Sequence, residues 1–289
     1  MRNEQEMMEM LIGFAEKDSR IRMVTLEGSR TNPNIAADCF QDYDIAYFVT
    51  DQESFKHDDE WLSIFGSRAM MQKPEAMELF PPELGNWFSY LILFEDGNKL
   101  DLTLIPLNEV EDYLNNSDGL VEVLLDKDGI VNREVIATDR QYWVKQPTAG
   151  EFDDCCNEFW MASTYVVKGL ARKELLFAAD HLNEIVRPNL LRMMSWHIGS
   201  ERGYTFSVGK HYKFIDRYLP ADSWDKLLTS FDGTGYPATW KSLFTCYELF
   251  RIYSGKVAEA LGYTYPDYDR AISGYTDRIY QNYGLEQRS

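Results

Sequence analysis

Two aspartates separated by a single residue, Asp42 and Asp44, begin an apolar run that continues to Val49. The residue types of this run are typical of a β-strand, in which positions i and i+2 lie on the same face. Asp42 and Asp44 are therefore expected to present their carboxylates together. Mg²⁺ prefers oxygen ligands and is commonly held by one or two carboxylates and by substrate phosphates, so the pair predicts a metal-dependent nucleotidyl-transfer site.

A turn precedes this strand. The β-prone run over residues 21–26 is followed by Glu27 and then by Gly28, Ser29 and Arg30. Glycine allows backbone amides to approach a ligand closely, and the Ser29 hydroxyl and the Arg30 guanidinium are further donors for triphosphate oxygens. The turn is a candidate phosphate-binding loop, although such a tripeptide taken alone is usually an ordinary turn.

A third carboxylate is expected on a β-hairpin. Residues 87–94 and 99–106 are β-type runs, and the four residues between them begin with Glu95 and contain a glycine. Asp101 lies in the otherwise apolar second run, where an ionised group is costly unless it is paired or bound to a metal. Asp101 is therefore a candidate metal ligand, general base or both, and Glu95 is a weaker candidate base. An arginine partner for a buried Asp101 is the alternative.

At this point the chain resembles a known family. The motif Gly28-Ser29 followed by Asp42-x-Asp44 resembles the signature of the nucleotidyltransferase fold that DNA polymerase beta shares with antibiotic nucleotidyltransferases. The chain is similar, over nearly its whole length, to the streptomycin-modifying aminoglycoside 6-adenylyltransferase family. The segments that carry the narrower resemblance are 26–32, 41–45, 99–106, 159–160 and 168–174. Glu27 departs from the broader superfamily, which often has an apolar residue before Gly-Ser.

The resemblance implies a reaction. The family moves AMP from ATP to the 6-hydroxyl of streptomycin and releases pyrophosphate, which gives streptomycin resistance. Asp42, Asp44 and Asp101 would be the catalytic and metal-binding residues, and two Mg²⁺ ions are expected. Gly28, Ser29 and Arg30 would contact the nucleotide.

The C-terminal half is expected to supply further binding groups. Lys168 and Arg172 share a helix face at i and i+4, with Lys173 beside them, and are candidates to reach triphosphate oxygens. A solvated face paired with a neighbouring glutamate is the alternative. Asp180 and Glu184 are also spaced i and i+4. Two acids on one face repel each other unless a cation lies between them. In related enzymes an acidic residue of the helical domain binds the cationic drug. The resemblance therefore makes Asp180 or Glu184 a candidate for substrate binding, with Asp180 favoured.

The charge is unevenly distributed along the 289 residues, whose formal net charge is −18. Residues 1–150 hold 13 Lys and Arg against 29 Asp and Glu, a net charge of −16. Such a half repels a nucleic-acid backbone and attracts a small polycation such as streptomycin, although acidity also serves solubility alone. No apolar stretch approaches the roughly 20 residues that span a bilayer, and the polar, acidic first residues lack the layout expected of a secretory signal. A cytoplasmic protein, a monomer without a nucleic-acid or membrane partner, is expected.

The expected fold class is α+β, with a mixed sheet flanked by helices and then an α-helical bundle. Pro147 and Gly150 interrupt the chain where its character becomes helical, so residues 1–148 are the predicted catalytic domain. Residues 149–289 are the predicted helical domain that binds substrate and nucleotide, with the ligand cleft between the two. Periodicity predicts helices over residues 4–17, 53–65, 107–114, 151–172, 175–199, 212–219, 224–230 and 236–262.

Two alternative functions are compatible with these residues. One is an enzyme of the same fold that acts on another acceptor, such as a lincosamide or a protein hydroxyl. The other is a non-catalytic binding module that keeps the fold without turnover. The presence of all three aspartates argues against the second alternative.

Overall fold

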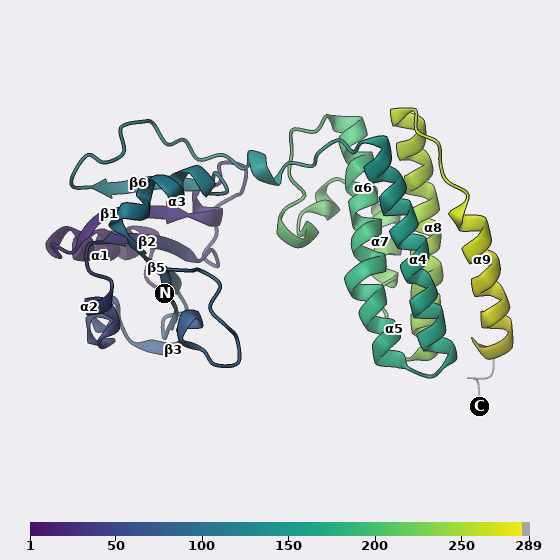
Figure 1. The fold of residues 1–289 in the computed structure, drawn as a ribbon, viewed down its shortest axis with the longest axis horizontal. Helices are drawn as coiled ribbons and strands as arrows, with labels where there is room; N and C mark the ends of the chain where they lie inside the picture. Colours follow the sequence, from purple (N-terminus) through teal and green to yellow (C-terminus); the bar gives the residue numbers. More distant parts are fainter. Residues whose placement is uncertain (285–289) are drawn as a thin grey trace. The chain divides into compact units, whose positions relative to one another are not determined.

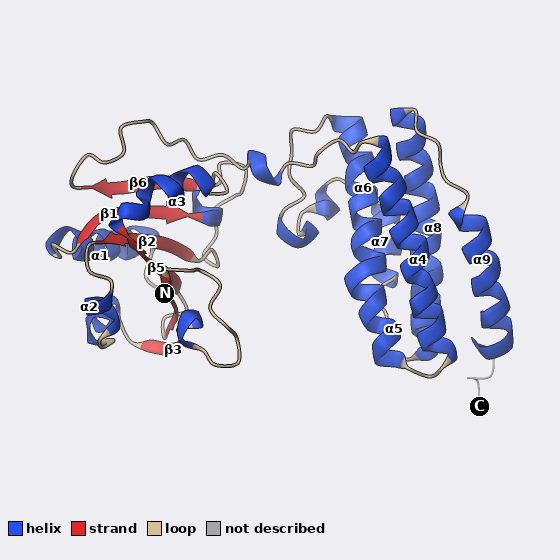
Figure 2. Ribbon diagram, in the orientation of Figure 1, coloured by secondary structure: helices blue, strands red, loops and turns tan. Residues whose placement is uncertain are grey.

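The structure is a computed structural model that describes residues 1–284. Its contacts divide the chain into two compact units, Met1–Gln141 and Tyr142–Ser289 (Figure 1). The first unit contains a mixed β-sheet with flanking helices, and the second is helical, so the predicted α+β class is confirmed (Figure 2). The roles assigned to residues 1–148 and 149–289 stay predictions. Within the described residues, no helix is long and apolar enough to cross a membrane.

The sheet of the first unit has six strands in the order β3-β4-β5-β2-β1-β6. The central pair β2–β5 is parallel, and the other neighbouring pairs are antiparallel. The strands are β1 (Ile21–Glu27), β2 (Tyr43–Val49), β3 (Arg68–Gln72), β4 (Phe88–Phe94), β5 (Lys99–Pro106) and β6 (Val121–Asp126). The four strands expected from the sequence are confirmed, whereas the short edge strands β3 and β6 were not predicted.

Two helices cover opposite faces of this sheet. Helix α1 (Glu4–Lys17) begins with a capping box at Asn3 and buries Met7 and Leu11 against one face. Helix α3 (Val110–Asn116) packs on the other face, where Ala46 and Phe48 of β2 contribute to its core. Because side chains alternate along a strand, the even-numbered residues of β2 share the α3 face. Asp44, the acidic residue of β2, therefore lies on the same face of the sheet as Ala46 and Phe48.

Of two predicted helices of this unit, one is interrupted in the structure and the other is confirmed with a 3₁₀ first turn. The segment 53–65 forms a single helical turn, α2 (Glu53–Lys56), and a separate 3₁₀ turn (Glu60–Phe65). The indole of Trp61 donates a hydrogen bond to the carbonyl of Phe55 at 2.9 Å, which folds the second turn back onto the first. The segment 107–114 begins with a 3₁₀ turn (Leu107–Glu109) before α3 starts. Short-range periodicity did not reveal the interruption between α2 and the 3₁₀ turn Glu60–Phe65.

The second unit is built on long helices. Its elements are α4 (Ala149–Ala171), α5 (Leu175–His181), a π-helical turn (Leu182–Val186), α6 (Arg187–Arg202), α7 (Ala221–Thr229), α8 (Tyr236–Leu261) and α9 (Tyr268–Ile279). Rings of α4 and α8 form the core, where Phe159 and Phe250 stack with centroids 3.7 Å apart. Thr148 and Glu151 form a capping box before α4, and Gly262 ends α8 in the left-handed region.

Most helices predicted for this unit are confirmed with small changes in their ends. The predicted helix over 175–199 is interrupted by the π-helical turn, and the predicted helix over 212–219 is replaced by two 3₁₀ turns. Helix α9 was not predicted. Positive φ angles at His211 and Tyr212, 55° and 62°, are incompatible with a continuous helix there.

Candidate active site

Three carboxylates lie side by side on neighbouring strands of the first unit. Glu27 at the end of β1 pairs with Asp44 of β2, and Asp44 pairs with Asp101 of β5. Directly opposed residues of paired strands present their side chains on the same face. Asp42 precedes β2 by one residue, and its side chain is 39% exposed. The structure therefore brings the three predicted aspartates together and adds Glu27, which the sequence alone did not indicate.

Burial and neighbouring charges raise the pKa values of two of these acids, Asp44 and Glu27. Burial, together with the nearby charges of Asp101 and Asp42, raises the pKa of Asp44 to about 6. Burial also raises the pKa of Glu27 to about 7, with the charge of Asp44 acting in the same direction and a hydrogen bond from Tyr113 opposing it. The row therefore favours binding of a cation, which would stabilise the ionised forms.

The ammonium of Lys99 bridges two of these acids. Its Nζ donates to Asp42 Oδ2 at 2.8 Å and to Asp101 Oδ2 at 2.7 Å. The other oxygen of Asp101, Oδ1, is buried and has no hydrogen-bond partner among the described residues. A buried carboxylate oxygen without a partner is unfavourable unless a further ligand satisfies it. Asp101 thus has one oxygen available for a bound group.

The Gly28 turn lies against the same row. Gly28 has φ +71°, and a Cβ atom at this position would lie 2.4 Å from Asp44 Oδ2. Only glycine allows the backbone to come this close to the carboxylate. The Gly28 amide donates to the carbonyl of Leu120 at 3.0 Å, so this amide is engaged within the protein. Ser29 and Arg30 follow in a 3₁₀ turn, Gly28–Thr31.

Arg30 supports the loop that carries Asp42. Its Nε donates to the carbonyl of Asp42 at 3.0 Å, and its NH2 group donates to the carbonyl of Gln41 at 2.8 Å. The guanidinium lies 3.7 Å from the centroid of the Tyr43 ring, and its side chain is only 6% exposed. Contact with a phosphate would require these bonds to be exchanged. The predicted phosphate-binding role of Arg30 stays a prediction beside this positioning role.

Glu95 lies in the turn between β4 and β5. Its side chain is exposed, and its amide donates to the carbonyl of Ser67 at 3.0 Å. Among the described residues, no hydrogen bond or ion pair joins its carboxylate to the aspartates. The proposed function of Glu95 as a base stays a prediction.

The donor set of this site fits Mg²⁺. All its acidic ligands are hard oxygens, Asp101 Oδ1 lacks a partner, and mutual repulsion of the carboxylates would be relieved by a divalent cation. Among residues 1–284, no three Asp, Glu, His or Cys side chains already converge as a ligand set. At this site the ammonium of Lys99 lies between Asp42 and Asp101, so metal binding would require a rearrangement.

The basic candidates of the second unit lie at the end of α4. Lys168 places its ammonium 4.7 Å from the centroid of the Tyr165 ring. Arg172 forms an ion pair of 3.0 Å with Glu174, and its side chain is 71% exposed. Lys173 has φ +62°, and its carbonyl accepts a hydrogen bond of 2.7 Å from the Tyr236 hydroxyl. All three are exposed, and their contact with triphosphate stays a prediction.

An acidic cavity of about 570 Å³ lies within the second unit, between the start of α4 and the π-helical turn with α6. Glu184 lines it together with Glu151, Asp154 and Glu158, and the polar wall also includes Arg192. Asp180 is exposed and does not line this cavity. The π-helical turn changes the angular relationship between Asp180 and Glu184 that regular helical spacing predicts. Of the two predicted acceptor residues, Glu184 lines this cavity and Asp180 does not.

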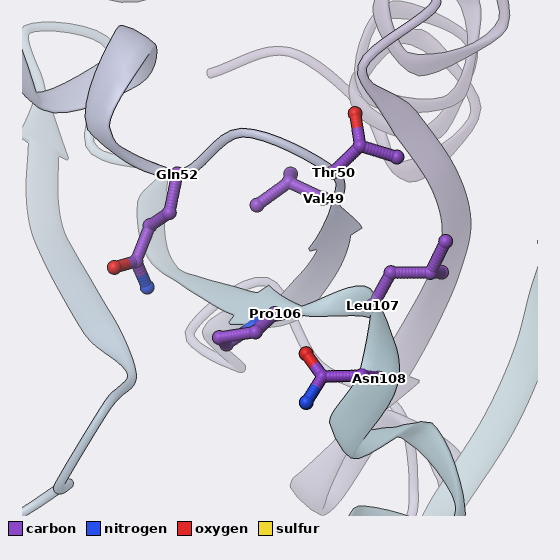
Figure 3. A pocket seen from close by; sticks show the side chains of 6 residues that line it. All are labelled: Val49, Thr50, Gln52, Pro106, Leu107 and Asn108. Carbon is purple, nitrogen blue, oxygen red and sulfur yellow. The ribbon is translucent and has the colours of Figure 1, made fainter.

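A second cavity, of about 390 Å³, lies in the first unit but away from the carboxylates (Figure 3). Its walls are formed by Val49, Thr50, Gln52, Pro106, Leu107 and Asn108, none of which is charged. These residues follow the carboxyl ends of β2 and β5, whereas Asp44 and Asp101 lie near the beginnings of the same strands. Val49 lies five positions after Asp44 along β2, which corresponds to about 17 Å of extended strand. This cavity is therefore distinct from the acidic site.

Comparisons with known proteins agree with this geometry. A family model described as streptomycin adenylyltransferase matches residues 1–279. A protein of Bacillus subtilis (strain 168) named aminoglycoside 6-adenylyltransferase is 70% identical over 280 residues, which cover 97% of this chain and 99% of that protein. Proteins of the same name from Staphylococcus aureus and Campylobacter jejuni are 50% and 53% identical, and each alignment covers at least 98% of both chains.

The matched range, residues 1–279, extends over both units and contains the positions of Glu27, Asp42, Asp44 and Asp101. Because the match covers nearly the whole chain, it does not rest on one short motif. The sequence identity of 70% is far above the level expected for proteins that share only a fold. The chain therefore belongs to the streptomycin adenylyltransferase family, and the protein is a nucleotidyltransferase enzyme.

Proposed function

We propose that this enzyme is a Mg²⁺-dependent aminoglycoside 6-adenylyltransferase that moves AMP from ATP to the 6-hydroxyl of streptomycin and releases pyrophosphate. The observation that carries the proposal is the register-matched pair Asp44 and Asp101, with Asp42 beside them, on one face of the sheet. The names of the curated relatives support the reaction class and the acceptor class. Modification of the drug would make the bacterium resistant to streptomycin.

The chemistry is a direct displacement. The drug's 6-hydroxyl oxygen attacks the α-phosphorus of ATP, a new P–O bond forms, and the bond to the departing pyrophosphate breaks. The hydroxyl proton is accepted by a carboxylate, and Asp101 is the candidate because one of its oxygens is unpaired. The enzyme forms no covalent intermediate with AMP.

Asp42, Asp44 and Asp101 would hold Mg²⁺, and two ions are expected. When bound, the metal supplies countercharge for the phosphate oxygens and for the attacking and leaving groups. The residues of the chain orient the reactants. The Gly28 turn brings the backbone against Asp44, and Arg30 fixes the loop of Asp42. Ser29 would donate to the triphosphate.

The acidic cavity of the second unit is the candidate acceptor site. Its four carboxylates, with Glu184 among them, match a substrate that carries two guanidinium groups. The strongly acidic first unit would attract the same polycation at long range. Lys168, Arg172 and Lys173 are the proposed contacts for the triphosphate. Asp180 and Glu95 are retained as secondary candidates for acceptor contacts.

The same proposal covers location and assembly. We infer a cytoplasmic monomer whose ligands are ATP and the drug and which has no nucleic-acid partner. A net charge of −18 opposes binding to a phosphate backbone.

A steady-state assay of pyrophosphate release tests the acceptor class. The purified enzyme is supplied with Mg²⁺ and ATP and with streptomycin, kanamycin or lincomycin in turn. Drug-dependent release is expected with streptomycin alone. Release that depends on lincomycin would favour the alternative acceptor, and release without any drug would indicate hydrolysis rather than transfer.

A further inference from the structure

Lys99 occupies a central position in the acidic site that the reaction described above does not use. It is the first residue of β5 and lies two positions before Asp101, so both side chains lie on the same face of the sheet. The β2–β5 register pairs Tyr43 with Leu100, which places Lys99 beside Asp42. The ammonium bridges Asp42 and Asp101 at 2.8 and 2.7 Å.

This bridge joins a loop residue to a strand residue. Asp42 lies outside β2, and its backbone carbonyl is held by Arg30, while its carboxylate is held by Lys99. Asp101 is fixed by its place in β5. Without the ammonium, repulsion between the two carboxylates would push the loop outward. Lys99 therefore keeps Asp42 and Asp101 converged.

The bridge also uses the oxygens that a metal ion needs. Mg²⁺ binds carboxylate oxygens at about 2.0–2.1 Å, and an ammonium and a divalent cation repel each other strongly at such short separations. Lys99 must leave at least one of the two aspartates before a metal can join them. Its side chain is 37% exposed and has a flexible stem of four carbons, so it can move while its backbone stays in β5.

We propose, on the basis of the proposed function, that Lys99 is an exchangeable countercation that couples metal binding to nucleotide binding. In the free enzyme its ammonium holds Asp42 and Asp101 together and competes with the divalent ion for them. When metal and nucleotide bind together, the ammonium transfers to the triphosphate, the anion that arrives with the metal. Lys99 is thus a positioning residue that makes binding of the metal alone weak and binding of metal with nucleotide strong.

Direct binding of Mn²⁺, without drug or turnover, tests this proposal. Titrations followed by electron paramagnetic resonance are carried out on the full chain and on Lys99→Met, with and without a non-hydrolysable α,β-methylene ATP. Lys99→Met is expected to bind Mn²⁺ alone about tenfold more tightly, because a positive charge near the site is removed. The gain in Mn²⁺ affinity that the nucleotide produces should be smaller in Lys99→Met than in the wild type.

Two variants separate charge from structure. Lys99→Arg keeps a cation at the bridge and should retain weak binding of Mn²⁺ alone. Lys56→Met removes a partly exposed lysine of α2 that pairs with Glu53 outside the group of Asp42, Asp44 and Asp101, and should behave as the wild type. Circular dichroism of each variant at saturating Mn²⁺ verifies that the fold is retained.

Unchanged or weaker binding of Mn²⁺ alone by a folded Lys99→Met would overturn the proposal, because competition would then be absent. The proposal would also be overturned if the nucleotide increased the affinity for Mn²⁺ by the same factor in the wild type and in Lys99→Met. The Mn²⁺ titration does not involve an acceptor. Failure of streptomycin as a substrate therefore leaves this result interpretable, and failure of the Lys99 proposal leaves the acceptor assignment unaffected.

Discussion

Asp44 of β2 lies directly opposite Asp101 of β5 in the parallel strand pair, so two carboxylates face each other across a single step of the sheet. Burial disfavours the ionised form of Asp44, and the charges of Asp101 and Asp42 add to the effect, so that the pKa of Asp44 is raised to about 6. The site therefore carries an electrostatic cost in the metal-free protein. A bound cation would remove that cost.

Asp44→Asn should abolish turnover while it stabilises the metal-free protein. Loss of a carboxylate that would hold the charge-neutralising cation is expected to lower kcat on the order of 10³-fold, comparable with the loss of an arginine finger, another charge-neutralising group, in phosphoryl transfer. The free energy of unfolding at pH 7.5 without metal should rise, because a buried repulsive charge is gone. Pyrophosphate release and urea denaturation measure the two effects. Near-normal release would exclude Asp44 as a metal ligand, and Asp58→Asn, in an exposed loop, is the matched control.

Glu27→Gln should change how the stability of the metal-free protein depends on pH. The pKa of Glu27 is raised to about 7 by burial and by the charge of Asp44, so the folded protein favours the protonated form. The contribution of Glu27 is therefore most favourable at low pH and is lost as the pH rises from about 4.5 through 7. Relative to the wild type, Glu27→Gln should gain on the order of 3 kcal/mol in unfolding free energy between pH 4 and pH 8.

Urea denaturation at a series of pH values in the presence of a chelator measures this difference. Glu122→Gln on the neighbouring strand β6 is the control, because that side chain is exposed and pairs opposite Leu26. Parallel pH profiles for Glu27→Gln and the wild type would show that Glu27 is ionised at its ordinary pKa.

Gly28→Ala should impair catalysis more than stability. The new Cβ would lie 2.4 Å from Asp44 Oδ2, so the carboxylate must move. A positive φ of 71° adds about 1 kcal/mol of backbone strain for alanine. Gly129→Ala is a matched control, since Gly129 has φ +62° but has no atom within 4 Å of the added Cβ. Similar losses of stability in both variants, with a loss of kcat in Gly28→Ala alone, are expected from thermal denaturation and pyrophosphate release. Equal kcat in the two variants would contradict the importance of the close approach to Asp44.

Charge reversal at Glu184 should weaken acceptor binding. Glu184→Lys places a cation in the acidic cavity and is expected to raise the KM for streptomycin about tenfold or more, with little change in the KM for ATP. Asp180→Lys is the paired variant, because Asp180 lies outside the cavity. If Asp180→Lys raises the drug KM and Glu184→Lys does not, the preference derived from the sequence is right and the cavity is not the acceptor site.

Much of the sheet could be predicted because its central strands carry strong local signals. The strand that begins after Asp42 and the hairpin that carries Asp101 are defined by alternating apolar residues and by a glycine-containing turn. The edge strands β3 and β6 are only partly buried. Their sequences therefore do not show the same alternation of apolar residues. Their formation depends on pairing with a distant strand, which local propensity does not encode.

The roles of Glu27 and Lys99 depend on strand register. The i+2 rule places Lys99 on the face of Asp101, which the sequence could have indicated. That Glu27 opposes Asp44, and that the ammonium reaches Asp42, follows only from pairings between segments far apart in the chain. The π-helical turn that contains Glu184 is likewise set by tertiary packing, and it changes the shared face that regular helical spacing predicts for Asp180 and Glu184.

Mass spectrometry of the drug after incubation with the enzyme tests the central claim most directly. Purified protein, Mg²⁺ and ATP are mixed with streptomycin, kanamycin or lincomycin, and phosphorus–proton correlation by nuclear magnetic resonance locates the modified hydroxyl. The account predicts streptomycin that carries one AMP on its 6-hydroxyl and no adduct on the other drugs. An adduct on another drug, or no adduct on any drug while ATP still binds, would contradict it.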